Sequence, residues 1–164
     1  MTDAIVSYFS QEGGLFAVLV LAMTPIIELR GAIPVGVGLD LDWRLVYLVS
    51  VIGNMLPVPF IILFIRPIIE YLARTKRFGK LAEKIKNRTM SKSDKVIKYK
   101  MIGLLLFVAI PLPGTGAWTG AALAGFLDMR LKDSVPMILL GVMIAGVLMM
   151  GLSYGFGTLI GNMF

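Results

Sequence analysis

The stretch PIIELRGAIP, Pro25–Pro34, places a carboxylate and a guanidinium, Glu28 and Arg30, between two apolar runs. The runs extend over residues 13–27 and 31–39, and neither has the roughly twenty residues that a helix needs to cross a bilayer. A charged residue at mid-membrane costs roughly 2.5–3.5 kcal/mol on insertion scales and usually faces a polar cavity. The stretch therefore predicts a site inside a membrane domain, or else a hairpin that stops at the lipid headgroups.

The composition of the chain is that of an integral membrane protein. Of its 164 residues, 57% are hydrophobic and 16% are charged, and further apolar regions extend over residues 45–65, 101–127 and 135–164. Such runs are typical of membrane spans. The first twelve residues contain no Lys or Arg, which argues against a cleavable signal. The absence of Cys and His excludes disulfides, thiolates and the commonest metal ligand, so we expect no metal or cofactor.

Positive charge is concentrated between Arg74 and Lys100, where eleven Lys or Arg stand against two acidic residues. This segment carries +9, although the whole chain carries only +6. Loops this basic stay in the cytoplasm, which sets the orientation of the flanking spans. Phe78, Leu81 and Ile85 recur at helical spacing and predict an amphipathic helix on the acidic inner leaflet. We favour this interpretation over nucleic-acid binding.

The chain resembles itself after a shift of 86 residues. Pro25 then coincides with Pro111, and the Asp-x-Arg tripeptide of residues 42–44 coincides with that of residues 128–130. Each half has a short apolar run, a Pro/Gly-rich break, a second short run, the Asp-x-Arg loop and a long span. We expect one membrane domain over residues 1–164, with a first repeat half over about 13–70, a basic linker over 71–100 and a second half over 101–164.

The apolar region 101–127 is interrupted by PLPGTGAW, Pro111–Trp118. Prolines remove backbone donors and clash with the preceding turn, so we expect a break here, with one kinked helix as the alternative. The pieces on either side have about ten residues each, roughly 15 Å of helix or half a membrane. Two such helices joined by a break form a re-entrant hairpin, whose broken backbone must be buried in protein or line a cavity.

These patterns predict an all-α integral membrane protein with an inverted repeat. Each half consists of a re-entrant helical hairpin and one transmembrane helix, and the basic amphipathic segment joins the halves on the cytoplasmic side. The first hairpin, about residues 13–39, then enters from outside, and the second enters from inside. Their broken tips meet near the midplane, as in secondary transporters that bind substrate between discontinuous helices.

The predicted site combines the two charged residues with two helix N-termini. We expect one helix to begin near Gly31–Pro34, since proline suits a first turn, and another near Gly116, with Thr115 as its N-cap. Such N-termini and Arg30 favour an anion, while Glu28 carries the coupling proton or holds Arg30 between substrates. The expected substrate- or ion-binding residues are Glu28, Arg30, Gly31, Pro34, Pro111, Pro113, Gly114, Thr115, Gly116, Trp118 and Thr119, with Asn54 and Tyr154 as secondary residues.

Several of these residues have a structural interpretation as well. Glu28 and Arg30 are two positions apart, so a helix would point them to nearly opposite sides and toward different partners. Asn54 precedes Pro57 and Pro59 and is expected to bond the carbonyls that these prolines leave free. The alternative for Trp118 is a packing residue or an interface anchor. Small residues four positions apart, at 141/145, 151/155 and 157/161, predict close helix packing or a homodimer seam.

The chain resembles the small multidrug export protein family in two motifs, ELRGAIP (28–34) and PLPGTGAW (111–118). The members of this family are regarded as relatives of the DedA superfamily. The resemblance covers nearly the whole chain and implies a multi-pass protein of the prokaryotic plasma membrane with two facing re-entrant hairpins. It assigns the required acidic residue and arginine to Glu28 and Arg30. Some DedA relatives are implicated in proton-driven movement of undecaprenyl phosphate or phospholipid. The second hairpin has Thr115 and no arginine, which departs from the DedA pattern.

Three functions remain open on the sequence. The first is a proton- or ion-coupled secondary transporter with a midplane site for an anionic or lipid-phosphate substrate. The second is an exporter of small lipophilic drugs or cations that Glu28 binds directly. The third is a non-transporting scaffold. No ATP-binding, hydrolase or metal-binding motif occurs, so we expect no enzyme. The expected partners are membrane lipids, the small-molecule or lipid substrate, the proton or other coupling ion and a second copy of the chain, but not nucleic acid.

The inverted arrangement makes a prediction about topology. A tag inserted after Met90 is expected in the cytoplasm and a tag after Phe164 outside, because each half crosses the membrane once. Accessibility of each tag to a membrane-impermeant reagent, in intact and in permeabilised cells, measures both positions. Both tags on one side would contradict the single crossing of each half.

Overall fold

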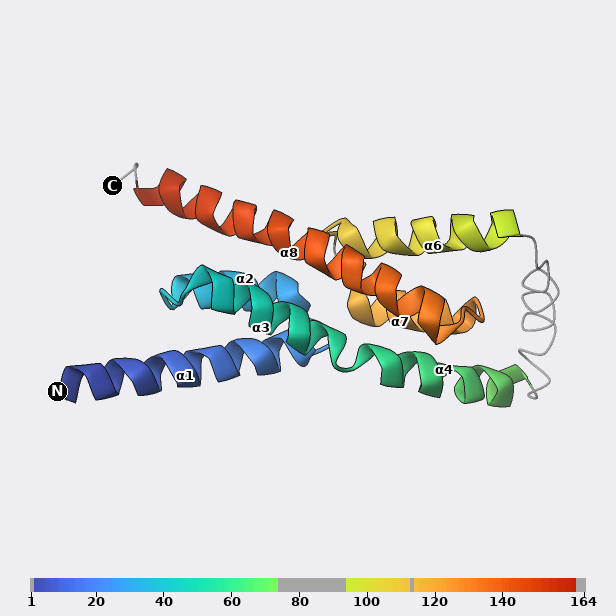
Figure 1. The fold of residues 1–164 in the computed structure, drawn as a ribbon, viewed down its shortest axis with the longest axis horizontal. Coiled ribbons are helices and arrows are strands. Elements are labelled where there is room, and N and C mark those ends of the chain that lie inside the picture. Colours follow the sequence, from blue (N-terminus) through green and yellow to red (C-terminus); the bar gives the residue numbers. More distant parts are fainter. Residues whose placement is uncertain (1, 74–93, 113, 162–164) are drawn as a thin grey trace. The chain divides into compact units, whose positions relative to one another are not determined.

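The computed structural model describes residues 2–73, 94–112 and 114–161, and these residues form helices joined by short turns (Figure 1). In chain order the helices are α1 (Thr2–Met23), α2 (Glu28–Gly38), α3 (Trp43–Met55), α4 (Val58–Ala73), α6 (Asp94–Ala109), α7 (Ala117–Phe126) and α8 (Leu131–Gly161). The expected all-helical class is therefore confirmed. The predicted amphipathic segment of Phe78, Leu81 and Ile85 lies outside the described residues.

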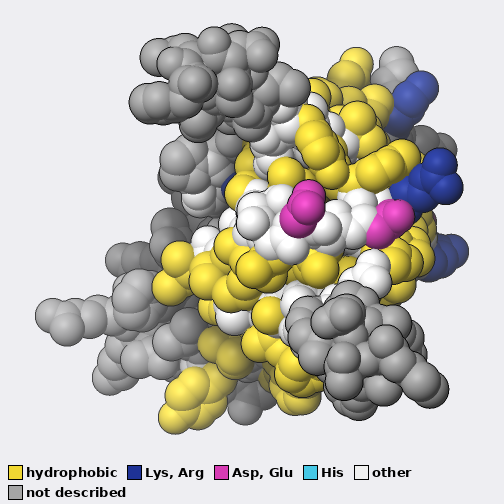
Figure 2. Space-filling view, turned by 90° about the vertical axis from the view of Figure 1, so that its left-hand side faces the viewer, with side chains coloured by type: hydrophobic (Ala, Val, Ile, Leu, Met, Phe, Trp, Pro, Cys, Tyr) yellow, Lys and Arg dark blue, Asp and Glu magenta, His cyan; other side chains and the backbone are white. Residues whose placement is uncertain are grey.

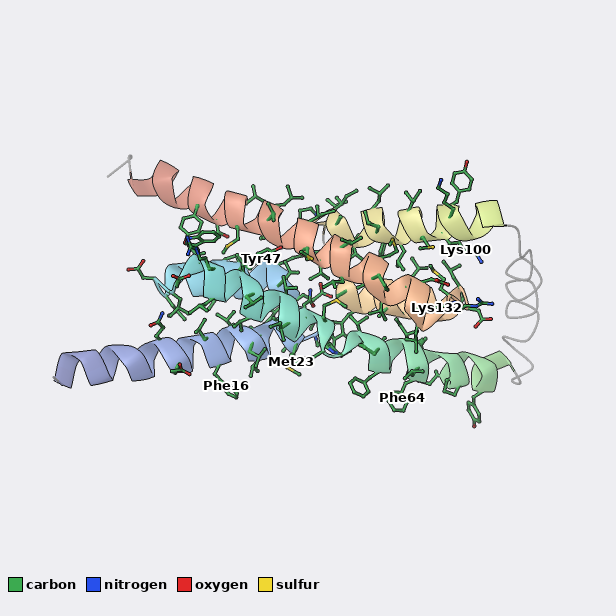
Figure 3. All side chains as sticks on the ribbon, in the orientation of Figure 1. Phe16, Met23, Tyr47, Phe64, Lys100 and Lys132 are labelled. Carbon is green, nitrogen blue, oxygen red and sulfur yellow. The ribbon has the colours of Figure 1, made fainter. Side chains whose placement is uncertain are left out.

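Within the described residues, two segments are long and apolar enough to cross a membrane. Trp43–Ile65 has 23 residues and passes through the junction of α3 and α4, and Leu131–Gly155 has 25 residues within α8. Phe16 and Phe64 are about two-thirds exposed and point away from their helices (Figure 3). On the face that Figure 2 shows, hydrophobic side chains cover much of the described surface. Exposed apolar surface of this extent is typical of contact with lipid or with another protein.

The chain divides into two compact units. The first consists of Met1–Leu56 and Val142–Phe164, and the second consists of Pro57–Gly141. The first unit therefore contains α1, α2, α3 and the C-terminal part of α8, whereas the second contains α4, α6, α7 and the start of α8. The division into two repeat halves and a linker stays a prediction.

In the first unit, α1 and α2 form an antiparallel hairpin that packs against α3 (Figure 1). The hairpin turns at residues 24–27, where Pro25 has no N–H to offer the carbonyl of Leu21. Thr24 compensates, because its amide and its hydroxyl both donate to that carbonyl, at 3.1 and 2.7 Å. The break was expected, but α1 is longer than expected: it begins at Thr2, well before Gly13.

In the second unit, α6 and α7 also run in opposite directions (Figure 1), and α7 packs against α4 and α6. The chain leaves α6 at Ala109 and enters α7 at Ala117. The alternative of one kinked helix over residues 101–127 is therefore wrong. With 10 residues, α7 has the expected half-membrane length, whereas α6 has 16 residues and begins inside the basic segment, at Asp94.

The C-terminal ends of α2 and α7 have the same local geometry. After α2, the amide of Leu41 donates to the carbonyl of Gly36, and Asp40 has a φ of 56°. After α7, the amide of Met129 donates to the carbonyl of Ala124, and Asp128 has a φ of 52°. This is the Schellman motif, in which a left-handed residue lets the chain satisfy the last carbonyls of a helix.

The matching positions in these two turns are 88 residues apart, because Asp40 corresponds to Asp128. The shift of 86 residues that the sequence suggested pairs Asp42 with Asp128 and is wrong by two residues at this turn. Asp42 has a different role: its carboxylate accepts the amides of Arg44 and Leu45, at 2.8 and 3.3 Å, and so caps the N-terminus of α3.

Close packing of α1 against α3 depends on Gly53. A Cβ at this position would lie 2.8 Å from the carbonyl oxygen of Leu19 and 3.0 Å from the Cβ of Ala22. Gly53→Ala is therefore expected to push the two helices apart and to lower the free energy of unfolding by about 1–3 kcal/mol, the usual cost of overpacking. Thermal unfolding in detergent measures the effect.

Gly103→Ala is the matched control, because Gly103 is also helical but nothing lies within 4 Å of its added Cβ. Alanine is a better helix former there by about 1 kcal/mol, so the control should be neutral or slightly stabilising. A Gly53→Ala variant as stable as the control would contradict the proposed contact.

Candidate functional site

The carboxylate of Glu28 is the most unusual group in the first hairpin. Glu28 is only 5% exposed, and its φ of 51° lies in the left-handed region that non-glycine residues rarely occupy. Its amide donates to the carbonyl of Thr24 at 3.1 Å, which holds it in this conformation. A left-handed residue costs about 1–2 kcal/mol, and strain of this kind is concentrated at functional sites.

Glu28 is also the first residue of α2. The partial positive charge at a helix N-terminus stabilises a carboxylate in the first turn. The sequence-based start of this helix near Gly31–Pro34 is wrong by about one turn. Pro34 lies inside the helix and is exposed, so it does not occupy the first turn; its missing N–H instead deprives the carbonyl of Arg30 of its helical donor.

Arg30 lies two residues after Glu28 and is half-buried. The expectation that the side chains of Glu28 and Arg30 face different partners stays a prediction. Gly31, the next residue of α2, lies close to the turn that precedes the helix, because a Cβ on Gly31 would approach the side chain of Ile27. The predicted residues Glu28, Arg30 and Gly31 are therefore brought together at one end of α2.

Three helix ends meet in this region. Gly36 of α2 lies against Val46 of the antiparallel α3. Glu28 is eight residues before Gly36 and Asn54 is eight residues after Val46, so the two lie at the same level along the helix axes. Gly53 lies against Leu19 and Ala22 of α1, which places the C-terminal ends of α1 and α3 side by side. The first unit thus gathers two helix C-termini and one N-terminus around the buried Glu28.

Two further polar side chains of α3 are buried in this packing. Ser50 is 0% exposed and Asn54 is 1% exposed, and their four-residue spacing places them on one face of the helix. Among the described residues, neither the Ser50 hydroxyl nor either polar atom of the Asn54 amide has a hydrogen-bond partner. Each such group costs about 1–3 kcal/mol when it is buried without a partner.

The expectation that Asn54 bonds the carbonyls freed by Pro57 and Pro59 is wrong, because its amide makes no hydrogen bond to any described residue. Ser50 was not among the residues predicted for the site. Its spacing of four residues from Asn54 within a span was the available signal, since polar residues in a membrane helix usually face the interior.

The second break is built differently. Thr115 does not cap α7; the N-cap is Gly116, without a side-chain hydrogen bond. The Thr115 hydroxyl lies 2.8 Å from the carbonyl of Ile110 and 3.0 Å from that of Leu112, and it donates toward both. Thr115 therefore holds the broken backbone together, and the expected N-cap is wrong. Gly114 has a φ of 83°, which glycine adopts without strain.

The remaining predicted residues of this break are less enclosed. Pro111 and Trp118 are half-buried, and Thr119 is exposed, with its hydroxyl donating to the carbonyl of Gly116 at 3.3 Å. Pro113 lies outside the described residues. This break belongs to the second compact unit and Glu28 to the first, so a site shared by both breaks stays a prediction.

Tyr154 does not join Asn54. It lines a groove of ≈380 Å³ with Trp43, Met150 and Gly151, near the start of α3. Trp43 and Asn54 are eleven residues apart, about 16 Å along the helix. The guanidinium of Arg44 lies over the ring of Trp43, 5.3 Å from its centroid, which is typical of a surface cation–π contact.

The fold and the buried polar groups define a helical membrane protein with a polar site between helix ends. The chain belongs to the family described as "Putative small multi-drug export protein", whose sequence model matches residues 28–148. The match begins at Glu28, and the resemblance seen in the two Pro/Gly-rich motifs is confirmed. No curated protein and no solved structure matches the chain. The family description and the two candidate spans together indicate a membrane location. No group of His, Cys, Asp and Glu suited to a metal occurs among the described residues.

Thr115 provides a test of the second break. Thr115→Val keeps the shape of the side chain but removes the hydroxyl that donates to the backbone carbonyls, so the free energy of unfolding is expected to fall by about 1 kcal/mol. Thr115→Ser should retain most of the stability. Thr119→Val is the matched control, because the Thr119 hydroxyl bonds within its own helix and is exposed. Equal melting temperatures for Thr115→Val and Thr119→Val in detergent would contradict the conclusion that the Thr115 hydroxyl holds the broken backbone together.

Proposed function

We propose that the chain is a secondary transporter that exports its substrate in exchange for a proton or another coupling ion. The observation that carries this proposal is the burial of Glu28 at the meeting point of three helix ends. A buried carboxylate in a membrane domain is costly and usually serves ion or substrate binding. The family description, which names export, supports the same class of function.

The position of Glu28 suits a residue that gains and loses a cation during transport. Its charge is favoured by the N-terminus of α2 and by Arg30, and opposed by its removal from water. Binding of a proton or other cation changes this balance. A conformational equilibrium responds to a ligand only through a difference in affinity between its states, and a buried carboxylate that becomes exposed provides one.

The short helices support a re-entrant arrangement. With 11 and 10 residues, α2 and α7 are about half as long as a membrane span. Each ends in the same Schellman turn and leads into one of the two long apolar segments. We propose that these two hairpins enter the plasma membrane of a prokaryotic cell from opposite sides, as an inverted repeat with a cytoplasmic basic linker.

Arg30 favours an anionic substrate. A half-buried guanidinium beside a helix end is suited to a phosphate, which it binds through two parallel hydrogen bonds. The proposed substrate is therefore an anion such as a lipid phosphate, of which undecaprenyl phosphate and phospholipid are the first to test. The second candidate is a lipophilic cation bound by Glu28, which the family description favours.

Glu28→Gln tests the coupling role. The amide has nearly the shape of the carboxylate but cannot exchange a cation, so gradient-driven accumulation in proteoliposomes should be lost while folding and substrate binding persist. Undecaprenyl phosphate, phospholipid and a lipophilic cation are assayed separately, with and without a pH or Na⁺ gradient. Glu12→Gln is the matched control, since Glu12 is an exposed carboxylate of α1; it should transport normally.

Arg30→Lys separates the two substrate classes. It is expected to raise KM for an anion about tenfold, because an ammonium loses the planar two-bond contact with phosphate, and to leave export of a cation unchanged.

Normal coupled transport by Glu28→Gln would remove Glu28 from the mechanism. A wild-type protein that moves none of the three substrates would favour a scaffold.

A further inference from the structure

The buried face of α3 offers oxygen atoms that the packing leaves without partners. The Ser50 hydroxyl and the Asn54 amide are at least 99% buried, and neither makes a hydrogen bond to a described residue. A proton on Glu28 would neutralise the carboxylate but leave both of these groups unsatisfied. A ligand that accepts electron pairs from several oxygens at once would satisfy the hydroxyl oxygen of Ser50 and the amide oxygen of Asn54.

The backbone adds further oxygens at the same place. Pro57 and Pro59 have no N–H, so the carbonyls of Gly53 and Met55 lack the donors that a continuing helix would supply. The ends of α1 and α3 lie side by side, as the contact of Gly53 with Leu19 and Ala22 requires. Helix C-termini carry partial negative charge and favour a cation.

We propose that Ser50, Asn54 and Glu28 bind a single Na⁺ ion at the meeting of these three helix ends. The inference rests on the proposed transport function and names its coupling ion. All the donors are oxygens, which hard cations prefer, and one carboxylate balances one positive charge. Free carbonyls at the ends of discontinuous helices are the usual ligands of Na⁺ in secondary transporters. In this proposal Glu28 holds a coupling Na⁺ ion in place of the coupling proton.

Thermal unfolding of the purified full chain in detergent tests the site. NaCl is increased against choline chloride or KCl at constant ionic strength. Because Na⁺ binds the folded state, the Tm should rise with the logarithm of the Na⁺ concentration, by roughly 5–10 °C at a hundred times Kd. Choline should give no rise and K⁺ a smaller one. A Tm that does not respond to Na⁺, or that responds equally to K⁺, would overturn the proposal.

Two variants locate the ion. Ser50→Ala and Asn54→Leu each remove one oxygen ligand and are expected to weaken the response to Na⁺ by about tenfold or more in apparent Kd. In Na⁺-free buffer Ser50→Ala should melt no lower than the wild type, because it also removes a polar group that lacks a partner. Ser134→Ala is the matched control: Ser134 is equally buried, but its hydroxyl already donates to the carbonyl of Arg130 at 3.0 Å. It should keep the full response.

Two outcomes separate this inference from the transport function. Binding of radioactive ²²Na⁺ to the wild type, without transport of any substrate tested, would retain the ion site and remove the transporter. Transport driven by a pH gradient in Na⁺-free buffer, with no bound ²²Na⁺, would remove the ion site and retain the transporter. Direct ²²Na⁺ binding also decides the question if a variant fails to fold, since a wild type that binds no ²²Na⁺ has no such site.

Discussion

In the membrane interior, each backbone N–H and C=O must find a partner within the protein, and the prolines of this chain break that rule at several points. The rest of the first unit depends on how these breaks are sheltered. Thr24 satisfies the carbonyl that Pro25 leaves free, and Gly53 allows α1 and α3 to approach closely. The helix ends are consequently gathered at one height, where their polar groups face protein.

The properties of Glu28 follow from that arrangement. The turn that reverses the chain holds Glu28 in a left-handed conformation, and the packing of the first unit removes it from solvent. Glycine in place of Glu28 would relieve the backbone strain, and an apolar residue would avoid burying a charge. The chain instead keeps a carboxylate there, and the same unit buries the Ser50 hydroxyl and the Asn54 amide without hydrogen-bond partners among the described residues.

The second hairpin has a similar frame but different chemistry. Its last turn reproduces the Schellman geometry of the first, with Asp128 in the position of Asp40. At its break, however, the side chain of Thr115 is occupied by backbone carbonyls, and no acidic residue occurs between Pro111 and Trp118. The charged groups at the breaks therefore lie in the first hairpin, and Thr115 has a structural role in the second.

The sequence by itself determined the helical membrane class, the two breaks and the candidacy of Glu28. These depend on hydrophobicity and on the covalent geometry of proline, which are properties of a residue and its neighbours in the chain. The tertiary structure decided where α2 begins, which carbonyls Thr115 bonds, and that Ser50 and Asn54 are buried without partners. The burial of Ser50 and Asn54 depends on helix register. Contacts such as that of Gly36 with Val46 set which face of α3 meets α1 and α2, and no local pattern encodes the proximity of these residues.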